Sequence, residues 1–233
     1  MSFNKKLNIS VFFPCYNEEK NLESLTNSIL NFLPAISDQY EVIIVNDGSK
    51  DRTREIAETL SKKNHHVKVF NHETNLGYGA ALKTGFKNAK FDYIFFTDGD
   101  NQFDIKEIER FIPFSQEFDV VAGYRINRRD NFIRRLNATS FKMFVRMLFG
   151  LQIRDLNCAF KLFKKKVIDA IDIESTGAFI NAEILIKAKK KGFTMTEVGV
   201  THYPRQWGTQ TGANPKVIFR AFCDLFKLHQ KLK

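Results

Sequence analysis

The first half of the chain alternates short apolar runs with longer amphipathic stretches. The apolar runs are suited to strands buried on both faces of a sheet and cover residues 7–13, 40–45, 67–70, 93–97 and 120–122. The stretches between them place apolar residues at helical spacing, so we expect helices over 19–32, 53–62, 79–89 and 105–114. Because strand–helix alternation builds mostly parallel sheets covered by helices, the sequence predicts an α/β fold.

The second half is less regular. Its patterns predict helices over 131–149, 182–191 and 216–232 and strands over 159–163 and 194–200. The chain has no internal repeat, no low-complexity tract and no linker rich in Pro, Gly or Ser. We therefore expect one domain over residues 1–233.

The net charge of +10 is unevenly distributed. Residues 1–120 carry 14 Lys and Arg against 18 Asp and Glu, a net charge of −4, whereas residues 121–233 carry 22 against 8, a net charge of +14. This asymmetry indicates an anionic partner for the second half, although a solvated basic surface would also explain it. On charge alone the partner could be nucleic acid, a phosphate-bearing substrate or an anionic membrane.

Three cysteines, widely spaced and odd in number, form neither a disulfide framework nor a zinc-ligand pattern and are typical of the reducing cytosol. The apolar run at 9–15 is short and lacks a small-residue cleavage site, which argues against a signal peptide. No run approaches the ~18 uncharged apolar residues of a membrane span. We expect a cytoplasmic protein that is soluble or peripheral to a membrane.

Ligands of parallel sheets bind beyond the carboxyl ends of the strands, so the residues that follow each strand form the candidate site. The first strand leads into P-C-Y-N-E-E at 14–19, without the Gly-rich turn of a dinucleotide site. Here Tyr16 could stack on a base, and Asn17 and Glu18 could hydrogen-bond to it. A plain turn with Asn17 or Glu18 as the helix cap explains the same residues.

The second and third strands are followed by weaker signals. Asp47 lies in N-D-G-S-K-D at 46–51, where its carboxylate could accept a hydrogen bond from a base or ribose hydroxyl, or simply belong to a turn. In N-L-G-Y-G-A-A at 75–81, Leu82 stands where a phosphate loop of the type G-x-G-x-x-G has its third glycine. Close packing of a helix on the sheet explains these small residues equally well.

The fourth strand is followed by two carboxylates, Asp98 and Asp100, and by the amide of Gln102. Hard divalent cations prefer oxygen ligands, and Mg2+ typically combines one or two carboxylates with substrate phosphates. A cation held there would neutralise a departing diphosphate. A D-G-D triplet is also common in plain turns, so its position at a strand end is what favours a metal site.

Taken in order, these four motifs resemble the successive signatures of family 2 glycosyltransferases of the GT-A fold. The likeness is greatest to dolichyl- and polyprenyl-phosphate glycosyltransferases of the dolichyl-phosphate mannose synthase type, and it covers nearly the whole chain. The resemblance implies a Rossmann-like, mostly parallel sheet and an inverting, metal-dependent hexosyltransferase. It also implies Mg2+ or Mn2+, a GDP- or UDP-linked sugar donor, a nucleotide-sugar-binding half at 1–123 and an acceptor half at 124–233.

The resemblance assigns residues as well. It implies a nucleotide-sugar site formed by Pro14, Tyr16, Glu18, Val45, Asp47, Asp98, Gly99, Asp100 and Gln102. Asp98, Asp100 and Gln102 match the positions that bind the metal and the diphosphate. Asn46 departs from the pattern, because many relatives have an Asp there.

Matches in the basic half imply a polyprenyl phosphate acceptor. G-Y-R at 123–125, D-L-N-C-A-F-K-L-F at 155–163 and R-Q-W-G at 205–208 resemble family segments, although a Ser-Lys pair that often follows the last is missing. A lipid phosphate is already anionic and needs charge balance more than a general base. We expect Arg125, Lys161 and Arg205 to cradle it, and Asp100, Arg125 and Arg205 to be the catalytic residues. A surface ion pair is the alternative for each cation.

Other functions stay open at this point. Transfer to a glycan or another hydroxyl would require a general base such as Asp130, although the Q-x-x-R-W signature of processive polysaccharide synthases is absent. The chain could also be a catalytically weak nucleotide-sugar-binding subunit. We do not expect a nucleic-acid partner, because no nucleic-acid-binding motif accompanies the basic half.

The terminal stretch at 216–232 combines apolar residues at helical spacing with several lysines and an arginine. Such a helix can lie in a bilayer interface, or it can close a domain. With a lipid acceptor we expect contact with an anionic membrane surface, either directly or through a membrane-anchoring partner subunit.

Overall fold

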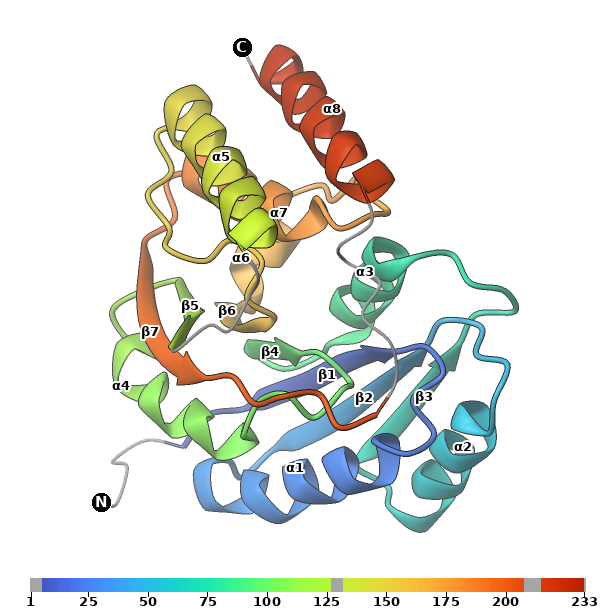
Figure 1. The fold of residues 1–233 in the computed structure, drawn as a ribbon. Helices are drawn as coiled ribbons and strands as arrows, with labels where there is room; N and C mark the ends of the chain where they lie inside the picture. The colour runs from blue at the N-terminus through green and yellow to red at the C-terminus, as the bar shows by residue number, and fades with distance from the viewer. Residues whose placement is uncertain (1–5, 127–131, 208–214, 233) are drawn as a thin grey trace.

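The computed structural model describes residues 6–126, 132–207 and 215–232. A seven-stranded sheet in the order β3-β2-β1-β4-β6-β5-β7 runs through the molecule (Figure 1). Its strands are β1 Ile9–Cys15, β2 Tyr40–Asn46, β3 Val67–Asn71, β4 Tyr93–Thr97, β5 Val120–Ile126, β6 Phe160–Lys164 and β7 Met195–Thr201. Every pairing is parallel except those of β6, which lies antiparallel between β4 and β5.

Helices cover both faces of this sheet. They are α1 Leu22–Ile36, α2 Thr53–Lys63, α3 Tyr78–Asn88, the 3-10 helix η1 Ile105–Arg110, α4 Ile112–Ser115, α5 Phe132–Phe149, α6 Lys165–Asp169, α7 Ile180–Lys190 and α8 Pro215–Lys231. One buried cluster joins α1, α2 and η1 to one face of the sheet, and a second joins α3, α6 and α7 to the other. The strands therefore need apolar side chains on both sides, which explains their continuous apolar runs.

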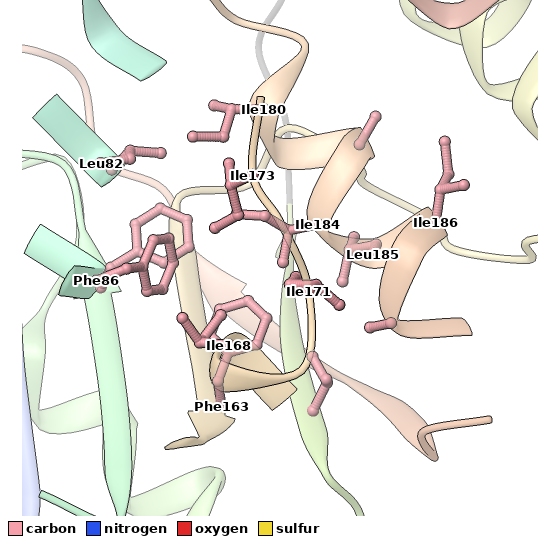
Figure 2. Packing of buried hydrophobic residues seen from close by; sticks show 14 of the residues in the cluster. Leu82, Phe86, Phe163, Ile168, Ile171, Ile173, Ile180, Ile184, Leu185 and Ile186 are labelled. Atoms are coloured by element: carbon pink, nitrogen blue, oxygen red, sulfur yellow. The ribbon is translucent and has the colours of Figure 1, made fainter. Parts of the chain in front are cut away.

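The second cluster connects the two halves of the chain. Figure 2 shows Leu82 and Phe86 of α3 facing Ile180 and Ile184 of α7, with Phe163 of β6 among them. The α3 helix approaches the sheet closely because it has glycine at position 85, where a Cβ atom would overlap the ring of Phe12.

The helices α5 and α8 lie side by side above this cluster (Figure 1). Edge-to-face rings join them, with centroids 5.2 Å apart for Phe141 and Phe222 and 6.0 Å apart for Phe144 and Phe226. Across the described ranges, no helix has the length and apolar content that a membrane crossing requires.

The predicted α/β fold is confirmed, with two local differences. The stretch 105–114 was predicted as one helix, but it forms η1 and the short α4, because Pro113 has no N–H to continue a helical ladder. The short α6 follows β6 directly and was not predicted, since five residues carry too little periodicity.

Candidate active site

The loops that follow β1 and β2 are bound to each other. The backbone N–H of Asn17 donates to Oγ of Ser49 at 2.9 Å, and Oδ1 of Asn17 accepts from the N–H of Lys50 at 2.8 Å. Asn17 adopts a left-handed backbone with φ of 56°, which turns the chain sharply after the strand. This turn leaves Tyr16 39% exposed, so its ring is available for a ligand at this edge.

The predicted nucleoside residues differ in their surroundings. Pro14 and Val45 are buried and face each other in the β1–β2 register. Asp47 is also buried, and its carboxylate accepts hydrogen bonds from the N–H groups of Leu76 and Gly77 at 2.9 Å and from His72 at 2.7 Å. Asp47 therefore holds the loop before α3, and its contact with a nucleoside stays a prediction.

The Asp98-Gly99-Asp100 loop packs tightly onto the end of β1. A Cβ atom at Gly99 would lie 2.7 Å from the carbonyl oxygen of Pro14, so a glycine is needed at this close approach. Asn101 continues the turn with φ of 58°. The two aspartates are thus held at the carboxyl edge of the sheet, beside the loop that carries Tyr16.

The electrostatics of the two aspartates are unusual. Burial raises the pKa of Asp98 to about 7, and the charge of Asp100 adds to the rise. Burial also raises the pKa of Asp100, against the N–H of Gln102 and the charge of Arg205, which lower it. Two half-buried carboxylates with raised pKa values form a place where a cation would be stabilised.

The segment that follows β7 crosses the same loops. Its Arg205 pairs with Glu18, and its Nη1 lies 3.7 Å from Oδ2 of Asp100. The side chain of Gln102 donates to the carbonyl oxygen of Tyr203 at 2.9 Å, and the N–H of Tyr203 donates back to the Gln102 carbonyl at 2.9 Å. The contacts thus bring together four predicted residues that are far apart in the sequence: Glu18, Asp100, Gln102 and Arg205.

The other two predicted cations are buried in the acceptor half. Arg125 forms a bidentate ion pair with Asp155, at 2.7 Å and 2.9 Å. Lys161 is only 1% exposed, and its ammonium donates to the carbonyl oxygens of Leu156 and Cys158. Both charges act on Asp98, whose pKa they lower, so they belong to the electrostatic surroundings of the site. Whether either cation contacts an acceptor phosphate stays a prediction.

A divalent cation fits the oxygen donors at this edge. Within the described part of the chain, no cluster of three or more His, Cys, Asp and Glu side chains could hold a metal by itself. Mg2+ does not need such a cluster, because substrate phosphates complete a shell that starts from one or two carboxylates. Asp98 and Asp100 supply that number.

Two contacts of this site were not predicted from the sequence. Tyr78 donates its hydroxyl to Oδ1 of Asp98 at 3.0 Å, although its G-Y-G segment indicated only close packing. Asp155 was quoted within a matching segment but was given no role. The alternative base Asp130 and the residues of 208–214 lie outside the described residues.

Comparison with known proteins agrees with the family resemblance of the sequence motifs. The sequence model described as "Glycosyl transferase family 2" matches residues 10–172. The undecaprenyl-phosphate 4-deoxy-4-formamido-L-arabinose transferase of Pectobacterium atrosepticum is 31% identical over 214 residues, which are 91% of this chain and 64% of that protein. Glycosyltransferase AglD of Haloferax volcanii is 30% identical over 210 residues, 84% of this chain and 33% of AglD. The chain thus spans less than two thirds of either relative.

Solved structures share the fold. The glucosyl-3-phosphoglycerate synthase of Mycobacterium tuberculosis in complex with phosphoglyceric acid superposes with a TM-score of 0.73 at 18% identity, covering 95% of this chain and 79% of that one. The same synthase with Mn2+ and UDP-glucose gives a TM-score of 0.71 at 17% identity, covering 96% and 79%. At these identities the likeness establishes the fold alone.

Proposed function

The chain belongs to glycosyltransferase family 2, and from this membership we propose that it transfers a sugar from a nucleotide-sugar donor to a polyprenyl phosphate. Its mostly parallel sheet has the GT-A arrangement seen in the solved neighbours. The observation that carries the proposal is the pair of half-buried carboxylates with raised pKa values, Asp98 and Asp100, at the carboxyl edge of this sheet. Inversion at the anomeric carbon is the outcome expected of the family.

On the donor side, the exposed ring of Tyr16 is placed to stack on the base. Asp98 and Asp100 would hold Mg2+ or Mn2+, with the amide of Gln102 beside them. When bound, this cation supplies Lewis-acid stabilisation of the diphosphate leaving group. Arg205 already contacts Asp100 and can move its guanidinium to a phosphate oxygen, for which its planar fork is suited.

The choice of UDP or GDP as the carrier is open. The mycobacterial synthase binds UDP-glucose together with Mn2+, which supports trying UDP-linked sugars first. Two relatives from this family support a lipid acceptor: the Pectobacterium atrosepticum and Proteus mirabilis transferases, both named for undecaprenyl phosphate.

The acceptor side also favours a phosphate over a hydroxyl. A hydroxyl acceptor needs a general base. In the described part of the acceptor half, the carboxylate of Asp155 is held by Nε and Nη2 of Arg125 and is poorly placed to take a proton. A cavity of about 360 Å³ borders Asp155 and carries the cationic side chains of Lys142 and Arg154 next to the apolar Phe141. This combination suits an anionic headgroup with an apolar tail.

The surface of α5 and α8 supports contact with a membrane. Two methionines of α5 and two phenylalanines of α8 are exposed: Met143, Met147, Phe219 and Phe226. We name these four residues the apolar patch. Lysines and arginines of the same helices accompany the patch, at positions 142, 146, 216, 220 and 227. Apolar side chains with flanking cations are what a peripheral helix needs at an anionic bilayer, so we propose attachment through the patch, alone or with an anchoring subunit.

One experiment tests this function. The full chain is incubated with panels of UDP- and GDP-sugars, Mn2+ and undecaprenyl phosphate, next to the Asp100→Ala variant. We expect a lipid-linked sugar from the wild type and a large loss in the variant. If Asp100→Ala forms as much product as the wild type, Asp100 is not a ligand of a metal that the reaction needs. Transfer only to free glycans would overturn the lipid acceptor, and nucleotide-sugar binding without any transfer would indicate a binding subunit.

A further inference from the structure

Tyr78 is the first residue of α3, and its hydroxyl reaches across to Oδ1 of Asp98 at 3.0 Å. A phenol has one proton, which this hydrogen bond uses, so the phenol oxygen can only accept from another group. The side chain of Asn181, in the first turn of α7, fills that place. In the side chain of Asn181 only the amide N–H can donate, since its oxygen is an acceptor. The hydrogen bonds therefore run in one direction, from Asn181 to Tyr78 to Asp98.

The backbone around Tyr78 is fixed by the acceptor half. The N–H of Gly79 donates to the carbonyl oxygen of Thr176 at 2.9 Å, and a Cβ atom at Gly79 would lie 2.5 Å from the carbonyl carbon of Thr176. The segment at 174–176 is itself held by Glu183 of α7, whose carboxylate accepts the N–H groups of Glu174 and Ser175 at 2.9 Å and 2.8 Å. The backbone next to Tyr78 is thus held by the loop at 174–176, which α7, the helix that carries Asn181, holds in turn.

From this arrangement we propose that Tyr78, supported by Asn181, is a positioning residue for Asp98. Its hydroxyl donates a hydrogen bond to Oδ1 of Asp98 and so holds the carboxylate in one rotamer. Among the described residues, no hydrogen bond is made to Oδ2 of Asp98, so that oxygen is the one left for a cation or a diphosphate. The proposal rests on the proposed donor site, and it assigns Tyr78 no contact with the reacting atoms.

The arrangement also connects the two halves of the enzyme. Asn181 lies in the acceptor half and Asp98 in the donor half, 83 residues apart in the sequence, with Tyr78 between them in space. A displacement of α7 would therefore change the orientation of Asp98. Tyr78 transmits the position of the acceptor half to the metal site.

The test measures metal binding separately from activity. Mn2+ affinity of the full chain is followed by electron paramagnetic resonance with UDP and, in a second arm, with GDP. Hydrogen bonds to charged groups are strong enough that loss of one should weaken Mn2+ binding about tenfold in Tyr78→Phe, and the loss of its support in Asn181→Ala about threefold. Tyr93→Phe is the matched control, because the Tyr93 hydroxyl accepts a hydrogen bond from the exposed Gln116 and Tyr93 lies at the start of β4, away from the aspartates.

Kinetics add a second readout. In Tyr78→Phe we expect the Mn2+ concentration for half-maximal activity to rise while kcat at saturating Mn2+ stays close to that of the wild type. A purely structural role would instead lower the melting temperature and leave the Mn2+ affinity of the folded fraction unchanged. The proposal is overturned if Tyr78→Phe and Asn181→Ala both bind Mn2+ like the wild type while Asp98→Asn does not. If Asp98→Asn and Asp100→Ala also bind like the wild type, the donor site itself is wrong.

Discussion

The guanidinium of Arg205 lies 3.7 Å from the carboxylate of Asp100, measured from Nη1 to Oδ2. Arg205 follows β7 in the acceptor half, whereas Asp100 follows β4 in the donor half. The same arginine also forms an ion pair with Glu18, so one positive charge partly neutralises two carboxylates at the edge of the sheet. A bound cation and diphosphate would change this balance, because the cation takes over Asp100 and the phosphates offer Arg205 new oxygens.

Replacing Arg205 by alanine should therefore reduce transfer. We expect kcat/KM for the nucleotide sugar to fall by about ten- to a hundredfold, since a charge-assisted contact to the leaving diphosphate is lost. Arg110→Ala is a suitable control, because Arg110 pairs with Glu107 on the surface of η1. Steady-state kinetics of both variants decide the matter: equal kcat/KM for Arg205→Ala and the wild type would assign the arginine to structure only.

The ion pair of Arg125 and Asp155 should be costly to break from one side. Both side chains are less than 10% exposed, at 9% and 8%, so Arg125→Met or Asp155→Leu removes one member of a buried ion pair and keeps the other. We expect either change to lower the free energy of unfolding by about 3–5 kcal/mol and the double change to recover much of it. Urea denaturation measures this. If the recovered double variant is also fully active, Arg125 has no role in binding the acceptor.

Such pairs also show where sequence analysis reaches its limit. The strands were predicted because burial on both faces demands continuous apolar runs, and β1, β2 and β4 have them. The motif residues Asp98 and Asp100 could be predicted once the strands were placed, because a parallel sheet brings its strand ends together at one edge. Side-chain partners such as Asp155 for Arg125 depend on the packing of the antiparallel β6 beside β5, and no periodicity in the sequence reports that packing.

Lys161 illustrates the same limit from the other side. Its place within the family-like segment at 155–163 predicted a ligand of the acceptor phosphate, with a surface ion pair as the alternative. In the structure it lies on β6 and is 1% exposed, which excludes a surface ion pair. Burial lowers the pKa of this ammonium, and two backbone carbonyls hold it. The sequence shows a cation but not which face of the strand it occupies.

The stability of the β5–β7 end should depend on pH through Asp119. Burial alone would raise the pKa of Asp119, but hydrogen bonds from Lys166 and Thr194 lower this pKa to about 2. An aspartate in an unfolded chain has a pKa of about 3.9. The stabilisation is therefore fully present above pH ~5 and is lost as the pH falls through ~4 towards 2. Urea denaturation of wild type and Asp119→Asn should give curves that converge at low pH; a constant difference between them would contradict this role.

Close packing of α3 on the sheet can be tested at Gly85. A methyl group there would overlap the buried ring of Phe12, so Gly85→Ala should lower the free energy of unfolding by about 1–3 kcal/mol despite the better helix propensity of alanine. Gly177→Ala is the matched control, because a Cβ atom at Gly177 meets nothing within 4 Å. Thermal denaturation should separate the two variants, and a Gly85→Ala protein as stable as the control would show that the Phe12 ring moves freely.

The apolar patch of α5 and α8 makes the proposed membrane contact measurable. Phe219 and Met147 are 72% and 66% exposed, so their replacement by serine changes the surface and not the core. Insertion of a large apolar side chain contributes ~1.5–3 kcal/mol, so the double variant should bind phosphatidylglycerol vesicles at least tenfold more weakly in a sedimentation assay. Leu76→Ser is the control, because Leu76 is 56% exposed but belongs to the loop before α3. Binding that falls equally in both variants would show that the patch does not direct the chain to the membrane. Binding that is unchanged when phosphatidylcholine replaces phosphatidylglycerol would show that the flanking cations do not select an anionic membrane.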